Sequence, residues 1–212
     1  MNRKYLLLAA TLGALVAGCS TIERSRNLAD PAVPGHVYAE QVCSICHGLD
    51  GNSVSPAFPV LAGQQAIYIA TQLKNFRSHG RMDPAGTEYM WGLIHHLTDA
   101  QIDALADYYS KQTARPRPVS ADAAVLATGK DIFEKGVPDQ NVIACQLCHG
   151  PKAQGIDAFP QLAHQHADYL VKQLNVFQYT QGRPGTPMEA VTHPLTGENK
   201  QAVAAYLQAF PD

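Results

Sequence analysis

Apolar side chains recur at helical spacing in several stretches of the chain, and these stretches come in similar pairs. The clearest pair spans residues 64–78 and 165–179 and carries these apolar positions: Ile67, Leu73 and Phe76, then Leu170, Leu174 and Phe177. Further helices are expected over 35–47 and 121–134, and after Thr98 and Thr196. No stretch alternates apolar and polar residues over a useful length. The pattern therefore predicts an all-α fold.

The two halves of the chain repeat each other in more than their hydrophobic pattern. The matching segments are Cys43–His47 with Cys145–His149, Phe58–Ala62 with Phe159–Ala163, Tyr68–Leu73 with Tyr169–Leu174, Gly80–Arg81 with Gly182–Arg183, and Met90–Thr98 with Met188–Thr196. The first pair is offset by 102 residues, which is too long for a solenoid repeat and suits two tandem small domains. The sequence therefore predicts a duplicated domain.

The join between the copies lies in a segment without apolar periodicity. Pro116 and Pro118 stand in it, so we expect an extended linker over residues 115–120. The predicted domains then cover residues 33–114 and 121–212. A few short helices in each hundred residues make a thin core, so something other than side chains must fill each domain.

The first residues have the pattern of an export signal. Basic residues at Arg3 and Lys4 precede an apolar run that is too short to span a bilayer, and small residues lead to Cys19. This ending resembles the lipobox of bacterial lipoproteins, in which the cysteine becomes the acylated first residue. We expect a signal peptide over 1–18, lipidation at Cys19 and a tether over 19–32, in a periplasmic protein held to the membrane by its lipid. An ordinary signal peptide or an uncleaved anchor stays open as an alternative.

Composition narrows the function classes. Only 16% of the residues are Asp, Glu, Lys or Arg, and the formal net charge is −2. Such a balance excludes a polybasic protein that binds nucleic acid through phosphate contacts, so no nucleic-acid partner is expected. Five cysteines are present, and one is accounted for by Cys19.

The other four cysteines form two Cys-x-x-Cys-His motifs. In an exported protein this motif indicates covalent attachment of c-type haem. Cys43 and Cys46, one helical turn apart, can each form a thioether with a porphyrin vinyl group, and His47 can bind the iron. Cys145, Cys148 and His149 would do the same in the second copy; that set completes two haem c groups. Each haem would also supply the missing core, as an apolar plate around which short helices pack.

Three other uses of these motifs fit the sequence less well. A zinc site needs further Cys or His ligands at recurring spacing, and the nearest downstream histidines do not repeat between the copies. A thioredoxin-like redox motif needs a strand before the cysteines, and none is predicted. A disulfide within each motif would leave both histidines without a role.

The repeat register suggests the sixth iron ligands. Met90 and Met188 fall at equivalent positions, in the segment expected to be a loop before the last helix of each copy. The rivals are Met82, which has no counterpart in the second copy, and His95 and His96, for which the second copy offers only His193, two residues before its Leu. We interpret Met82 as loop filling and the histidines as surface side chains. The same interpretation applies to the remaining unrepeated histidines, which are His36, His79, His164 and His166. A thioether opposite an imidazole raises the iron potential and leaves no open position for a substrate.

Several further residues are candidates for contacts around the haems. An iron-bound histidine usually donates its other ring nitrogen to an oxygen, and the carbonyls of Pro59 and Pro160 are candidates, although a proline that ends a helix explains both equally well. Arg81 and Arg183 could neutralise haem propionates. So could Lys74 and Lys172, for which a solvated helix face is an equal explanation.

With these motifs in view, the sequence resembles dihaem cytochromes c of the c4 type. The segments that carry the resemblance are Cys43–Gly48, Cys145–Pro151, Phe58–Gln64, Tyr68–Lys74 and the two methionine blocks, within residues 33–212. The resemblance implies two cytochrome-c-like domains related by a pseudo-twofold axis, two low-spin haems with His and Met ligands, haem edges that face each other, and terminal oxidases, notably of the cbb3 type, as partners. The chain departs from the family at His164, where glycine is expected, and at Trp91-Gly92 after Met90.

Three classes of function follow. The first is an electron carrier that exchanges one electron at each haem with redox partner proteins, namely a respiratory donor complex and a terminal oxidase. The second is a dihaem enzyme, such as a peroxidase, which needs a displaceable sixth ligand, or a thiosulfate dehydrogenase, which resembles a Cys-ligated haem protein. The third is a fixed cytochrome subunit of a dehydrogenase or oxidase complex. We expect the carrier, with no catalytic residue.

Overall fold

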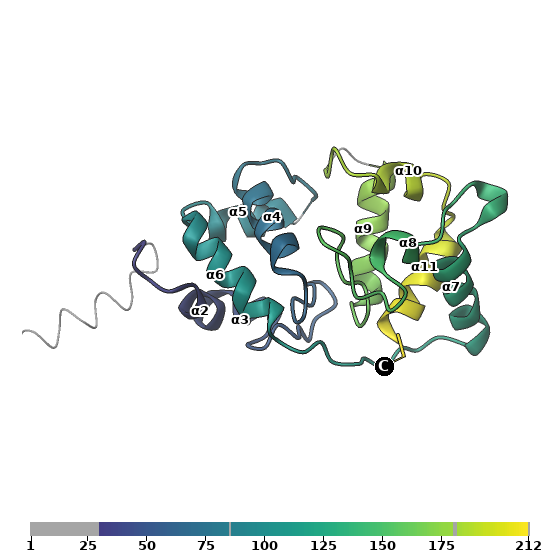
Figure 1. Cartoon of the computed structure of the whole chain (residues 1–212), viewed down its shortest axis with the longest axis horizontal. Coiled ribbons are helices and arrows are strands. Elements are labelled where there is room, and N and C mark those ends of the chain that lie inside the picture. Colours follow the sequence, from purple (N-terminus) through teal and green to yellow (C-terminus); the bar gives the residue numbers. More distant parts are fainter. Residues whose placement is uncertain (1–29, 85, 180–181, 212) are drawn as a thin grey trace, which may run out of the picture.

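The chain forms two helical domains that lie side by side. A computed structural model describes residues 30–84, 86–179 and 182–211. The predicted signal peptide, Cys19 and nearly all of the predicted tether fall outside this part. Figure 1 shows the first domain in purple to teal and the second in green to yellow, with the linker running along the lower edge past the C-terminus.

The first domain is built from short helices. Their bounds are α2 (Gly35–Tyr38), the π-helix η1 (Ala39–Cys43), α3 (Ser44–His47), α4 (Ala66–Arg77), α5 (Gly86–Ile94) and α6 (Asp99–Ser110). The first three elements form one continuous helical segment, as predicted over 35–47, with a widened turn just before the histidine. A π-turn of this kind is rare and often marks a functional position. A capping box begins α6: the Thr98 hydroxyl accepts from the Gln101 N–H at 3.2 Å, and the Thr98 N–H donates to the Gln101 side chain at 3.0 Å.

The second domain repeats this arrangement with one change. Its elements are α7 (Ala123–Lys135), the 3₁₀-helix η2 (Pro138–Gln140), α8 (Gln146–His149), α9 (Ala167–Tyr179), α10 (Met188–Thr192) and α11 (Gly197–Gln208). Here α7 and the motif helix α8 are separate, because extra residues turn back between them and form an isolated bridge from Val137 to Val142. Among the described residues, strand-like pairing is limited to isolated bridges of this kind.

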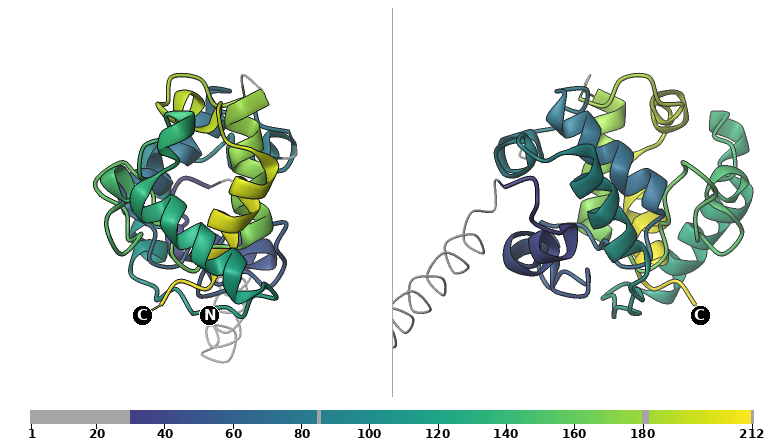
Figure 2. Two further views of the ribbon diagram at one scale, coloured as in Figure 1. Left: turned by 90° about the vertical axis from the view of Figure 1, so that its right-hand side faces the viewer. Right: turned by 60° about the vertical axis from the view of Figure 1, so that its left-hand side comes forward.

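Each domain has its own apolar core. In the first, α2 and α4 pack on α6, with Tyr38, Ile102, Leu105 and Tyr109 almost fully buried. In the second, α7 crosses α11, and the crossing is visible in the end-on view of Figure 2. The helices approach closely there because Gly129 has no side chain: a Cβ at that position would lie 2.1 Å from the Ala202 carbonyl oxygen. The all-α, two-domain prediction is therefore confirmed.

Two sequence predictions need correction. Met90 and Met188 were expected in loops, whereas Met90 lies within α5 and Met188 begins α10. These helices have nine and five residues, too few to show a clear helical period in the sequence. Residues 113–122, which include the predicted linker, are without regular structure. No helix in the described part is both long and apolar enough to traverse a bilayer.

Candidate functional site

The two Cys-x-x-Cys-His motifs occupy equivalent helical turns in the two domains. Cys43 ends the π-turn and Cys46 lies in α3, while Cys145 precedes α8 and Cys148 lies within it. All four thiols are half-buried, and no disulfide joins them in the described structure. Burial raises the pKa of Cys43 and of Cys145 to about 11, so both are neutral thiols at physiological pH.

The motif histidines are buried and held in the same way. His47 is 7% exposed and His149 is 6% exposed. The Nδ1 atom of His47 lies 2.9 Å from the Pro59 carbonyl oxygen, and that of His149 lies 2.8 Å from the Pro160 carbonyl oxygen. A carbonyl only accepts hydrogen bonds, so Nδ1 carries the proton in both rings. The structure thus brings together each predicted histidine and its predicted proline.

These histidines suit a metal ligand. Burial lowers the pKa of both rings, with the proline carbonyl acting weakly in the opposite direction, so the neutral imidazole is favoured. With Nδ1 engaged, Nε2 is the nitrogen left to bind iron. The donor set of two thiols and one oriented imidazole in a helical turn fits haem c in both domains. A tetrahedral zinc site needs four ligands; in the described residues no three His, Cys, Asp or Glu side chains gather suitably.

The two predicted methionines lie in matching places. Both side chains are half-buried, and Met90 packs against the core of the first domain. The helix of Met90, α5, packs on α4, and that of Met188, α10, packs on α9. The rival Met82 is 56% exposed, and its backbone N–H donates to the Gly182 carbonyl of the second domain at 2.8 Å.

The histidines outside the two motifs have different surroundings. His79 and His95 stack on the Trp91 ring, with centroid distances of 5.3 and 4.8 Å. His96 lies 3.1 Å from the Tyr38 hydroxyl. The prediction of a surface side chain is wrong for His166, which is 6% exposed.

His166 is buried because it crosses between the domains. Its Nε2 atom lies 3.0 Å from both the hydroxyl and the carbonyl oxygen of Ser53. Burial lowers its pKa, and the nearby Arg117 acts in the same direction. His164, two residues earlier, takes a left-handed backbone with φ of 60°, close to the 70° of the equivalent Gly63. This position calls for glycine, and the histidine departs from the family pattern without changing the turn.

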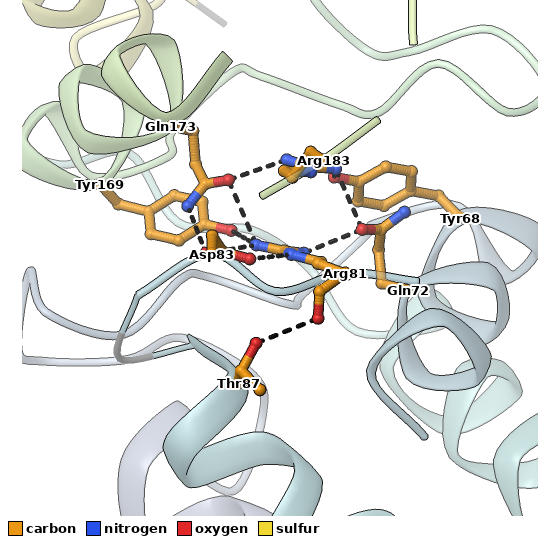
Figure 3. A network of polar contacts seen from close by, with 8 residues as sticks. All are labelled: Tyr68, Gln72, Arg81, Asp83, Thr87, Tyr169, Gln173 and Arg183. Carbon is orange, nitrogen blue, oxygen red and sulfur yellow. Dashed lines mark hydrogen bonds and ion pairs between the residues drawn. The ribbon is translucent and has the colours of Figure 1, made fainter. Parts of the chain in front are cut away.

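The two predicted arginines meet at the domain interface rather than at separate sites (Figure 3). Arg81 Nη1 donates to Gln72 of its own domain at 2.9 Å, and Nη2 reaches Gln173 of the other domain at 3.2 Å. Arg183 mirrors this, donating to Gln173 at 2.8 Å and to Gln72 at 3.0 Å. Figure 3 shows the two glutamines on either side of the paired guanidinium groups.

Tyrosines from α4 and α9 complete this cluster. The Tyr169 hydroxyl lies 3.3 Å from Arg81, and the Tyr68 hydroxyl lies 3.0 Å from Arg183. Each guanidinium also lies over a phenyl ring of its own domain, 4.4 Å from the Phe76 centroid for Arg81. The cluster is therefore nearly symmetric about the interface.

One residue breaks the symmetry. Asp83 is 1% exposed, forms a 2.6 Å ion pair with Arg81 Nε and accepts from Gln173 at 3.2 Å. Burial by itself raises the pKa of Asp83, but the hydrogen bonds and charge of Arg81 outweigh it and hold the pKa below its ordinary value. Asp83 was missed in the sequence because it has no equivalent in the second copy, where Gly185 follows Arg183 at the same distance.

The two lysines considered for propionate contacts lie on half-exposed helix faces. Lys74 pairs with Asp103 at 3.2 Å on the surface of α4 and α6, which fits a solvated helix face. Lys172 is half-buried on α9 and takes part in none of the ion pairs found among the described residues. Neither lysine joins the cluster of arginines between the domains.

Comparisons with known proteins agree with this arrangement. The family model for cytochrome c matches residues 33–112 and 126–210, so it finds both copies. The structure is also similar to cytochrome c4 of Acidithiobacillus ferrooxidans, with a TM-score of 0.73 and 38% sequence identity. The match covers 79% of this chain and 97% of that cytochrome. The chain belongs to the dihaem cytochrome c4 family. This cytochrome therefore carries two covalently bound haem c groups and belongs to a family of electron-transfer proteins.

Two curated relatives describe the range of this family. Cytochrome c-552 of Acidithiobacillus ferridurans is 36% identical to this cytochrome over 99% of the chain and 88% of the relative. A thiosulfate dehydrogenase electron acceptor of Thiomonas intermedia is 35% identical over 80% of the chain and 78% of the relative. Their names assign both of them to electron transfer.

Proposed function

We propose that Cys43 and Cys46 bind the first haem, that Cys145 and Cys148 bind the second, and that His47 and His149 are the axial ligands. When bound, each haem supplies one-electron chemistry between ferrous and ferric iron. The observation that carries this proposal is the matched pair of buried histidines, each with Nδ1 on a proline carbonyl at 2.9 or 2.8 Å. This bond fixes the ring plane and increases the basicity of Nε2.

Met90 and Met188 are the proposed sixth ligands. Their support is the repeat register together with their half-buried places on α5 and α10. A thioether stabilises ferrous iron, which suits a carrier of fairly high potential. A filled coordination sphere also argues against a peroxidase, which needs a displaceable ligand.

In this proposal the cytochrome carries electrons outside the cytoplasm, from respiratory donors to a terminal oxidase, with the cbb3 type as one candidate. The similarity to a thiosulfate dehydrogenase electron acceptor favours a second donor, a thiosulfate-oxidising enzyme that passes electrons to this chain. A direct assay distinguishes the two proposed donors. Mixing the oxidised cytochrome with either purified enzyme and its substrate measures which one reduces the haems faster.

We also propose that residues 1–18 are an export signal and that Cys19 is acylated. The expected result of Cys19→Ser is release of the cytochrome from the membrane fraction into the soluble periplasm, with both haems still attached. An unchanged membrane fraction would contradict a lipid tether at this residue. The unaltered protein, fractionated in parallel, is the control.

Optical spectroscopy tests the haem ligands. A pyridine haemochrome assay should give two haems per chain, and the oxidised protein should show the near-infrared band of methionine bound to ferric iron. Met188→His should lower the potential of one haem and remove about half of this band, whereas Met82→Leu should change neither. A high-spin spectrum of the unaltered protein would refute the carrier and favour an enzyme with an open iron position.

A further inference from the structure

Two equivalent glutamines reach across the domain interface and hold the backbone of the opposite domain. Gln165 Oε1 accepts from the Val60 N–H at 2.8 Å, and its Nε2 donates to the Val60 carbonyl at 3.0 Å. Gln64 does the same in the other direction, accepting from the Gln161 N–H at 2.8 Å and donating to the Gln161 carbonyl at 3.0 Å. Both side chains are buried, with 5% and 6% exposure.

The position of these contacts connects them to the histidines. The Val60 N–H and the Pro59 carbonyl belong to one peptide group, and that carbonyl accepts from Nδ1 of His47 at 2.9 Å. The Gln161 N–H likewise shares its peptide group with the Pro160 carbonyl, which accepts from His149. A chain of two hydrogen bonds therefore runs from each histidine, through one peptide, to a glutamine of the other domain.

Such chains are cooperative. An acceptor on the N–H side of a peptide polarises the group and makes its carbonyl a stronger acceptor, by about 10–30% per bond. A stronger bond to Nδ1 gives the imidazole more anionic character, which stabilises ferric iron and lowers the potential. The same two-point contact also fixes the carbonyl in space, so that the ring plane is held as well.

We propose that Gln165 is a positioning residue for His47 and Gln64 for His149, so that each domain tunes the axial ligand of the other. This inference rests on the proposed function, because it requires iron at both histidines. It makes the potential of each haem dependent on contact between the domains.

The two chains of hydrogen bonds are not equivalent. The Gln161 N–H is shared between Gln64 at 2.8 Å and Gln65 Oε1 at 3.0 Å. Among the residues that the structure describes, the Val60 N–H has one acceptor, Gln165 Oε1. Loss of Gln64 therefore leaves a second acceptor on the peptide next to Pro160, and its effect should be smaller than the loss of Gln165.

The test replaces Gln165 by methionine, which has similar volume and no comparable acceptor, in the full haem-loaded chain. Spectroelectrochemical titration gives both potentials, and paramagnetic NMR assigns each haem through the ring signals of its own motif histidine, His47 or His149. In Gln165→Met the ratio of ferrous to ferric iron in the first haem should rise about threefold at fixed potential, or about 30 mV at 59 mV per tenfold change. The potential of the second haem should not change.

Two further variants make the assignment specific. Gln64→Met should raise only the potential of the second haem, and by less. Gln112→Met removes a glutamine whose Nε2 donates to the Tyr108 carbonyl within its own domain at 3.2 Å, and it should move neither potential. If Gln165→Met does not accumulate, Gln165→Asn retracts the amide by one methylene and should give the same direction of change.

The outcomes separate the inference from the function beneath it. A shift confined to the haem of the opposite domain, with a weaker Nδ1–H hydrogen bond of that histidine by NMR, supports the inference. A shift of the haem in the same domain, equal shifts of both haems, or no shift while two haems and the methionine–iron band remain would overturn it and leave the proposed ligands intact. Absence of histidine-bound iron in the unaltered protein would instead refute the proposed function.

Discussion

The crossing of α7 and α11 provides a sharp test of the packing around the second haem. In Gly129→Ala the new Cβ would lie 2.1 Å from the Ala202 carbonyl oxygen and 2.7 Å from Tyr206 Cβ. Unstrained contacts between heavy atoms lie near 3.5 Å, so the two atoms must move apart by about 1.4 Å. Since the Ala202 oxygen belongs to the helix backbone, it cannot rotate away as a side chain would.

The expected cost follows from two opposing effects. Overpacking a core typically costs about 1–3 kcal/mol, and a backbone clash belongs at the upper end of that range. In the opposite direction, alanine stabilises a helix interior by about 1 kcal/mol relative to glycine. The net loss in the free energy of unfolding should therefore be about 2 kcal/mol, which corresponds to a fall of about 10 °C in the midpoint for a domain of this size.

Guanidinium unfolding of the haem-loaded protein, followed by helical circular dichroism, measures this loss from the shift in midpoint. Gly197→Ala is the matched control: it lies at the start of α11, and a Cβ there meets no heavy atom within 4 Å. We expect the control to stay within about 0.5 kcal/mol of the unaltered protein. A Gly129→Ala protein as stable as the unaltered one would refute the close helix approach.

Three further perturbations test the interface and the helix caps. Asp83→Ala leaves the buried Arg81 without its ion-pair partner and should lower the free energy of unfolding by about 3 kcal/mol. Burial lowers the pKa of His166, so as the pH falls the unfolded chain takes up a proton at this ring before the folded chain does. The contribution of His166 to the free energy of unfolding is therefore complete above about pH 6.5 and is lost as the pH falls toward the pKa of the folded state. Thr98→Ala removes a hydroxyl that accepts from the Gln101 N–H and donates to Gln101 Oε1, and it should cost about 1 kcal/mol, more than Thr196→Ala, whose hydroxyl accepts a single bond from the Asn199 N–H.

Each of these has a control. Asp103→Ala breaks a half-exposed pair with Lys74 and should cost less than about 1 kcal/mol; a loss equal to that of Asp83→Ala would contradict the role of burial. His166→Gln should flatten the fall in stability between pH 7 and pH 5, and an identical pH profile would show that this ring does not titrate as inferred. Equal losses from the two threonine variants would mean that the bond from the Thr98 hydroxyl to Gln101 Oε1 adds nothing to the cap.

The sequence predicted the helices that are long enough to show a period. The stripes of Leu73 and Phe76 and of Leu174 and Phe177 mark α4 and α9 within two residues of their observed ends. It also named the Pro59 and Pro160 carbonyls as candidate acceptors for the histidines, since Phe-Pro-x-Leu recurs at a comparable distance after each motif, but it left a helix-ending proline as an equal explanation. A five-residue helix such as α10 has no such signal, because it is stabilised by packing on α9 rather than by its own pattern.

Contacts between the domains could not be predicted in the same way. The repeated Tyr68, Gln72, Tyr169 and Gln173 were visible in the sequence only as marks of duplication, because their partners depend on how the copies face each other. His166 meets a serine 113 residues away, and nothing local indicates that burial. Asp83 is unique to one copy, so the comparison of the repeats passes over it.

The reciprocal glutamines have a consequence for how such a chain can arise. Gln64 and Gln165 occupy equivalent positions and each binds the other's domain, so the interface is isologous, like that of a symmetric dimer of one-domain subunits. When two such subunits are joined in one chain, each domain meets the other at an effective concentration in the millimolar range. At that concentration an interface with a binding free energy of about 4 kcal/mol is already half formed. Fusion also frees the two halves to diverge. Asp83 is a difference that a homodimer encoded by one gene could not place on one side alone.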